Sequence, residues 1–137
     1  MLFSRTMDVQ KAKTMNPIVL AFVGDAVYSL CVREVFASTT DKKSGELSEM
    51  TANVVKATSQ AKFIDELMPL LTEEENDVFR RGRNAKKPSH AKHSGLAEYN
   101  KSTGFEAVIG FLYLTGNEER LRFLLGTNQS LKDKIKG

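Results

Sequence analysis

Residues 16–37 read NPIVLAFVGDAVYSLCVREVFA, and this stretch decides the fold. Asn16 followed by Pro17 is typical of a helix start, because Asn caps the first amides and proline suits the first helical position. From there to about Ala37 the residues are apolar on nearly every side of a helix. Val, Phe and Tyr also suit strands, but the length and the cap favour a helix. Such a helix must be covered on most sides, by its own chain or by a partner subunit.

The rest of the chain shows helical spacing of apolar residues, interrupted by polar turns. Thr72 and Glu75 form a capping box that opens one of these helices, and Gly116 and Asn117 separate the last two. No alternating strand pattern and no internal repeat is visible. We therefore predict an all-α fold. Besides the first helix, the expected helical segments cover about residues 47–67 (with a bend), 72–83, 97–114 and 118–125.

The length of 137 residues predicts one domain with a real core. We expect residues 1–15 to form an N-terminal extension, 16–126 the folded domain, and 127–137 a frayed tail. A single cysteine, Cys31, excludes an internal disulfide and fits a reducing compartment. The N-terminus does not resemble a signal peptide, and the first apolar run is shorter than the roughly 20 residues that span a bilayer. These features favour a cytoplasmic protein with no membrane partner.

Two acidic residues stand alone in the two most apolar stretches. Asp25 is the only charge in IVLAFVGDAVYSLCV (18–32), and Glu106 is the only charge in STGFEAVIGFLYLTGN (102–117). A buried carboxylate without a partner costs several kcal/mol, roughly, and neither stretch offers a Lys or Arg. Two such acids side by side indicate a site for Mg²⁺, with Mn²⁺ as the alternative. The other interpretation is that each acid is bonded to backbone or to a distant Arg.

Small residues flank Asp25 and leave room for a ligand or for close helix approach; Gly110 lies on the same helical face as Glu106. No Ser–His or Cys–His arrangement competes with the acids, because His90 and His93 lie in a polar loop. Glycine-rich phosphate loops are absent as well.

Positive charge is gathered in one segment. Residues 80–93, RRGRNAKKPSHAKH, hold six Lys or Arg, two His and no acid, which leaves 14 basic against 17 acidic residues elsewhere. Without interleaved aromatics, contact with the backbone of a duplex fits better than stacking on single strands. A solvated surface is the alternative. The residues expected to contact nucleic acid are Arg80, Arg81, Arg83, Asn84, Lys86 and Lys87.

FVGDAV (22–27) and FEAVIGFLYL (105–114) resemble the two signature segments of the ribonuclease III endonuclease domain, a helical fold that cuts double-stranded RNA. The short length, without a C-terminal RNA-binding domain, and RGRNAK (81–86) are similar to the Mini-III branch of that family. The similarity covers about residues 17–125.

The resemblance implies that Asp25 and Glu106 are catalytic and bind metal, and that Phe22 packs across the interface of a homodimer. Each subunit would then cut one strand. The sequence departs from the larger enzymes at two acidic positions, now Ala21 and Thr103. A third acidic position is replaced by Ser44, with Glu46 as a nearby substitute. A four-carboxylate site has become a two-carboxylate one, as in the Mini-III branch.

We therefore expect a Mg²⁺-dependent endoribonuclease that cleaves double-stranded RNA. The resemblance also implies a role in maturation of the large-subunit (23S) ribosomal RNA precursor, with a ribosomal protein as a further partner. The alternative is a non-catalytic module on the same fold that binds duplex RNA or the ribosome.

Overall fold

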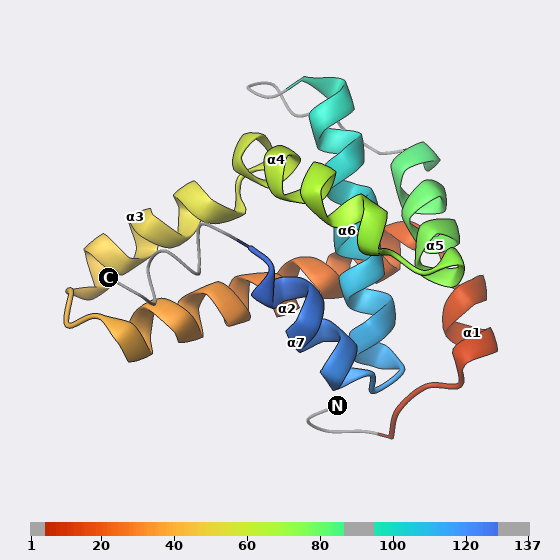
Figure 1. The fold of residues 1–137 in the computed structure, drawn as a ribbon, viewed down its shortest axis with the longest axis horizontal. Helices are drawn as coiled ribbons and strands as arrows, with labels where there is room; N and C mark the ends of the chain where they lie inside the picture. Colours follow the sequence, from red (N-terminus) through yellow and green to blue (C-terminus); the bar gives the residue numbers. More distant parts are fainter. Residues whose placement is uncertain (1–4, 87–94, 129–137) are drawn as a thin grey trace.

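The computed structural model describes residues 5–86 and 95–128, and this part of the chain is helical without strands (Figure 1). The predicted all-α class and the expected helices are confirmed. No helix in these two ranges has the length and apolarity needed to cross a bilayer. The elements are α1 (Val9–Thr14), α2 (Pro17–Thr39), α3 (Ser44–Val55), α4 (Ala57–Leu67), the 3₁₀ turn η1 (Met68–Leu70), α5 (Glu73–Asn84), α6 (Leu96–Leu114) and α7 (Glu118–Gly126).

Helix α6 is the centre of the fold. It packs against α2, α5, α4 and α7, and α2 crosses it in the middle of the molecule (Figure 1). Every residue of α6 from Ser102 to Phe105 and from Ala107 to Leu112 is buried, which explains why its sequence is apolar on all sides. Phe105 contributes to this core through edge-to-face contacts with Tyr28 of α2 and Phe63 of α4.

Helix α2 has one covered and one open face. Leu20, Tyr28, Val32 and Phe36, spaced by four or eight residues, are at most 1% exposed and face the core. On the opposite face, apolar side chains remain in contact with solvent in the single chain. They are Val19, Phe22 and Leu30, with exposed fractions of 44%, 79% and 58%.

The expected bend within residues 47–67 is a full break at Lys56, whose backbone is extended (φ −65°, ψ 152°). Gln60 stabilises the break from α4, because its side-chain amide donates to the carbonyl of Val55 at 2.6 Å. Gln60 is 1% exposed and also accepts a hydrogen bond from the hydroxyl of Ser102. This buried polar contact ties the α3–α4 corner to α6.

Helix α1 lies inside the segment that the sequence suggested to be an extension. The carboxylate of Asp8 caps it by accepting from the amides of Gln10 and Lys11 at 3.1 and 3.3 Å. Ala12 is fully buried, so the helix is packed against the domain. With only six residues, α1 is too short for helical periodicity to reveal it.

At the other end of the domain, Asn128 is 3% exposed, and its amide donates to the hydroxyl of Tyr28 at 2.8 Å. Asn128 therefore belongs to the packed part of the chain. The rest of the segment expected to be frayed, residues 129–137, lies outside the described residues.

A buried ion pair joins the start of α5 to α7. Both oxygens of Glu75, which is 3% exposed, accept from Arg120 at 2.8 Å, and Arg120 also donates to the carbonyl of Leu70 at 2.5 Å. Burial alone would raise the pKa of Glu75, but the hydrogen bonds from Arg120 and Thr72 lower it below its ordinary value. Thr72 and Glu75 also form the predicted capping box.

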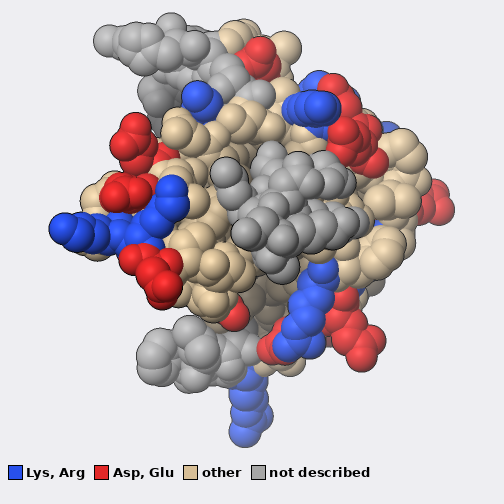
Figure 2. Space-filling view, turned by 60° about the vertical axis from the view of Figure 1, so that its left-hand side comes forward, with Lys and Arg blue, Asp and Glu red and all other residues tan. Residues whose placement is uncertain are grey.

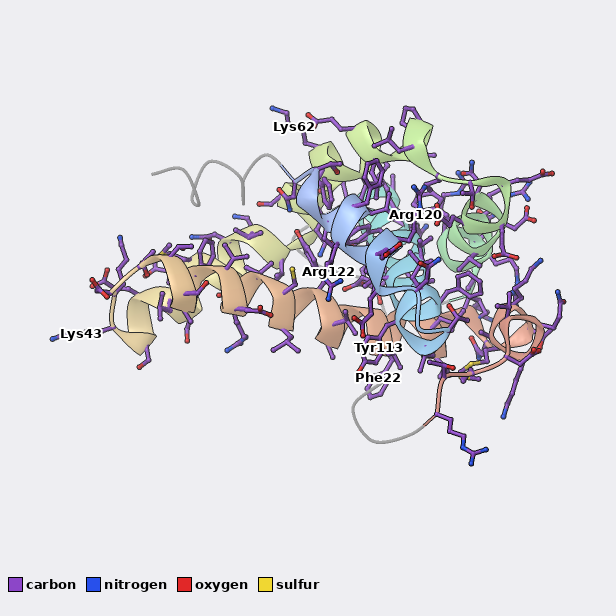
Figure 3. The ribbon with its side chains drawn as sticks, turned by 60° about the horizontal axis from the view of Figure 1, so that its bottom comes forward. Phe22, Lys43, Lys62, Tyr113, Arg120 and Arg122 are labelled. Atoms are coloured by element: carbon purple, nitrogen blue, oxygen red, sulfur yellow. The ribbon has the colours of Figure 1, made fainter. Side chains whose placement is uncertain are left out.

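Replacing Arg120 by Ala should lower the free energy of unfolding by about 2 kcal/mol, because it leaves the carboxylate of Glu75 buried without its cation. Arg122 is the matched control, since it lies on the same helix but pairs with Glu118 in solvent (Figure 3). Arg122→Ala should change stability by no more than about 0.5 kcal/mol. Urea denaturation of both variants checks this, and equal effects would contradict it.

Candidate active site

Two glycines allow α2 and α6 to touch backbone to backbone where they cross. A Cβ atom added to Gly24 would lie 1.7 Å from the carbonyl oxygen of Glu106. A Cβ atom added to Gly110 would lie 1.9 Å from the carbonyl oxygen of Leu20. Only glycine fits at either position, so the two helices are fixed in register at this point.

This crossing brings the two isolated acids together. Asp25 follows Gly24 on α2, and its side chain shares a hydrogen bond with the carboxyl group of Glu106 on α6. Glu106 is partly buried, whereas Asp25 is exposed. The expectation that both acids are buried is therefore wrong for Asp25, which lies beside the uncovered face of α2. A cation and a large substrate can reach the pair from solvent.

The proximity of the acids changes the proton affinity of Glu106. Burial, the hydrogen bond with Asp25 and the negative charge of Asp25 together raise the pKa of Glu106 to about 9. At neutral pH and without a cation, the carboxyl group of Glu106 therefore keeps its proton. A divalent cation held by Asp25 and Glu106 would take the place of that proton and offset the negative charge of both acids, and carboxylate oxygens are the donors that Mg²⁺ and Mn²⁺ prefer. The residues present thus fit such an ion.

The described residues add no third acid to this pair, because they contain no group of three or more potential ligands. Ala21 and Thr103, which stand where the larger enzymes have acids, are both buried. The hydroxyl of Thr103 is bonded to the carbonyl of Tyr99 at 3.0 Å. Within residues 5–86 and 95–128 the site therefore has two carboxylates, and a Mg²⁺ ion held by one or two carboxylates retains several waters.

Ser44 and Glu46 do not complete the site. Ser44 is exposed and lines a small hollow with Leu47, beside Arg33 and Ala37 of the second half of α2. Glu46 is exposed and pairs with Lys42 at 3.8 Å. Figure 3 shows this end of the molecule, marked by Lys43, far from Phe22 and the helix crossing. The suggestion that Glu46 replaces a missing site acid is therefore not supported in the single chain.

The basic segment begins on α5, which packs closely on the site helix. A Cβ atom added to Gly82 would lie 3.0 Å from both the Ala107 side chain and the backbone of Gly104. This contact holds the basic end of α5 against the turn of α6 that carries Glu106. On the face that includes α3, by contrast, positive and negative side chains are interspersed (Figure 2).

The residues expected to contact nucleic acid differ in their surroundings. Arg80 pairs with Asp77 in solvent, and Lys86 is exposed. Arg83 lies 5.9 Å from the ring centre of Phe79 and donates to the side chain of Asn84.

Arg81 has a structural role that the sequence did not reveal. Its guanidinium donates to the carbonyl of Met15 at 3.0 Å and to that of Lys13, at the end of α1. Lys87 lies outside the described residues.

Comparison with known proteins agrees with this arrangement. A family model, the ribonuclease III domain, matches residues 18–117, which include both helices of the acid pair. The chain therefore belongs to the ribonuclease III family, and it is an endoribonuclease.

Its relatives narrow the assignment. It is 44% identical over 117 residues to Mini-ribonuclease 3 of Clostridium tetani, covering 85% of this chain and 78% of that protein. It is 48% identical over 106 residues to Mini-ribonuclease 3 of Brevibacillus brevis, covering 77% of this chain and 79% of that protein. Within the family, the chain falls in the Mini-III branch. A crystal structure of a protein from Fusobacterium nucleatum shares the fold, with a TM-score of 0.75 and 26% identity. The match covers 82% of this chain and 90% of that one.

The stability of the metal-free protein should depend on pH through Glu106. Its pKa is about 9 in the folded chain against 4.5 ordinarily, so between these values the folded state binds more protons than the unfolded state. The free energy of unfolding should therefore fall as pH rises from about 5 to 8.5, by at most about 1.4 kcal/mol per pH unit. Denaturation in EDTA at several pH values measures this dependence. The variant Glu106→Gln should flatten the profile of unfolding free energy against pH. An unchanged slope in that variant would contradict the assignment.

Proposed function

We propose that this chain is a Mg²⁺-dependent endonuclease for double-stranded RNA, with Mn²⁺ as an alternative ion. The observation that carries the proposal is the contact between the exposed Asp25 and the partly buried Glu106 at the helix crossing, where the two carboxyl groups share a hydrogen bond. Two neighbouring acids that cannot both ionise without repulsion are a poor choice for stabilising apolar helices, which favours a ligand role over a structural one.

The chain's own residues supply positioning and charge. Asp25 and Glu106 would hold the ion, and its chemistry there would be to lower the pKa of a bound water and to offset charge on the phosphate. Arg and Lys side chains at the end of α5 would hold the duplex backbone beside the acids. The residues proposed for this contact are Arg80, Arg83, Asn84, Lys86 and Lys87; Arg81 would contribute charge while it holds α1.

We also propose that the chain acts as a homodimer through α2, with one centre in each subunit. Phe22 is the most exposed of the large apolar side chains described, and Figure 3 shows it pointing away from the body of the molecule. A second copy would cover the row that runs from Val19 through Phe22 to Leu30. We expect Phe22→Ala to shift the wild-type dimer toward monomer in sedimentation at micromolar concentration. A monomeric wild type would contradict the proposal.

Membership of the Mini-III branch supports a more specific role. We infer that the substrate is the precursor of large-subunit (23S) ribosomal RNA, cleaved in the cytoplasm in a duplex region, with a ribosomal protein as a further partner. The free Cys31 agrees with a reducing compartment.

The experiment that tests the function is incubation of the purified protein with a long RNA duplex, with Mg²⁺ and with EDTA, beside a single-stranded RNA of the same sequence. Cleavage of the duplex only with Mg²⁺ is expected. Duplex binding without cleavage under any divalent ion would favour the alternative, a non-catalytic RNA-binding module. Equal cleavage of both RNAs would contradict the duplex specificity.

A further inference from the structure

We propose that the groove between α1 and α5 binds the phosphate backbone of the substrate duplex, so that the N-terminal helix is part of the RNA-binding surface. This inference rests on the proposed function, because it assumes a duplex RNA substrate. It extends the surface beyond the matched family domain, which begins at residue 18, whereas α1 ends at Thr14.

The groove has the size and the lining of a polyanion site. Its volume is about 570 Å³, and it is open to solvent along the two helices. Gln10, Lys13 and Thr14 line it from α1, and Asp77, Arg80 and Arg81 from α5. Val78 and Asn84 complete the lining, so that three cations and three neutral hydrogen-bonding side chains face one acid, a lining suited to phosphate oxygens.

The cations of this groove are available to an anion to different degrees. Arg81 donates to main-chain carbonyls of α1, so no acid neutralises its charge in these contacts. Lys13 pairs with Glu74 at 3.4 Å, but the two side chains are 32% and 44% exposed. A solvated pair of this kind contributes little, so a phosphate can replace Glu74 at Lys13 at small cost.

Contacts within the chain hold the two helices of the groove in place. Arg81 joins α5 to the end of α1, and Ala12 of α1 is fully buried against the domain. The amide of Met7 donates to the carbonyl of Leu114 at 2.8 Å, which fixes the chain that leads into α1. Side chains on a fixed frame lose less entropy on binding than those on a loose tail.

The test compares two solvent-accessible Lys–Glu pairs at opposite ends of the protein, Lys13–Glu74 at the groove and Lys42–Glu46 at the start of α3. Binding of a blunt RNA duplex is measured in EDTA at several salt concentrations. Lys13→Ala should weaken binding on the order of fivefold and reduce the salt slope by about 0.9, the contribution of one phosphate contact. Lys42→Ala removes the same charge and should change binding less than about twofold.

Replacing the acid of the groove pair should change duplex affinity in the opposite direction. Glu74→Gln frees Lys13 and should tighten duplex binding about threefold, whereas Glu46→Gln should leave it unchanged. This gain cannot arise from loss of structure, so it separates an RNA contact from a structural role of Lys13.

The outcomes distinguish the two proposals. If the wild type binds duplex RNA but the two lysine variants weaken it equally, or Glu74→Gln weakens it, the groove does not contact RNA and the proposed function stands. If the wild type binds no duplex at all, the proposed function and the groove assignment both fail.

Discussion

Asp25→Asn and Glu106→Gln are each expected to reduce duplex cleavage by more than 100-fold while leaving duplex binding and the fold intact. Mutations of groups that merely support metal ligands typically cost about 10–100-fold, and loss of a ligand should cost more. The amides are close in shape to the acids, so packing at the helix crossing should change little. Single-turnover cleavage with Mg²⁺, together with duplex binding in EDTA, measures the two effects separately.

Glu34→Gln is the matched control for these variants, because it makes the same chemical change at an exposed position of α2. It should cleave RNA at the wild-type rate. Near wild-type cleavage by either Asp25→Asn or Glu106→Gln at moderate Mg²⁺ would show that the residue is not a ligand. Loss of duplex binding in either variant would instead indicate that the acid pair supports the fold.

Gly24→Ala and Gly110→Ala should each destabilise the protein by more than about 3 kcal/mol. Overpacking typically costs about 1–3 kcal/mol where side chains can move, but here the added methyl group meets backbone oxygens at 1.7 and 1.9 Å. The helices would have to separate, and the carboxyl groups of Asp25 and Glu106 with them. Guanidinium denaturation measures the loss, and any folded fraction should bind Mn²⁺ more weakly than the wild type.

Gly45→Ala is the control for the glycine pair, because a Cβ atom at Gly45 would have no neighbour within 4 Å. This position is near the start of α3, and the change should stabilise the protein by about 0.4–1 kcal/mol. If Gly24→Ala has an effect as small as that of Gly45→Ala, the helices do not touch as described.

The local structure could be predicted from the sequence because its signals are short-range. The Asn16 side chain accepts from the amide of Ile18 at 2.8 Å, as the Asn-Pro pair predicted. Both hydrogen bonds of the capping box at Thr72 are present. The pairing of Asp25 with Glu106 could also be predicted, because two isolated acids in apolar helices require a common explanation.

The remaining features depend on contacts between distant segments. Arg81 donates to a carbonyl 68 residues away. The neighbouring sequence contains no feature that would distinguish the role of Arg81 from that of Arg80 or Arg83. The exposure of Asp25 depends on which face of α2 the other helices cover. Because both faces carry apolar residues, the sequence does not show which face is buried. Gly24 and Gly110 are a further example. Their small size in the sequence indicates that another segment can approach closely, but only the structure shows that α2 and α6 are the two helices in contact.

The contact between Gly24 and Gly110 has a consequence for how this enzyme could be altered. The spacing of the two acid-bearing backbones is set by main-chain atoms, so enlarging or shrinking core side chains elsewhere should leave this spacing unchanged. Redesign of the proposed ion site for a larger ion such as Ca²⁺ would therefore have to change the length of the acids themselves, for example through Glu106→Asp. Core substitutions that preserve the contact between Gly24 and Gly110 should not change which ion the proposed site prefers.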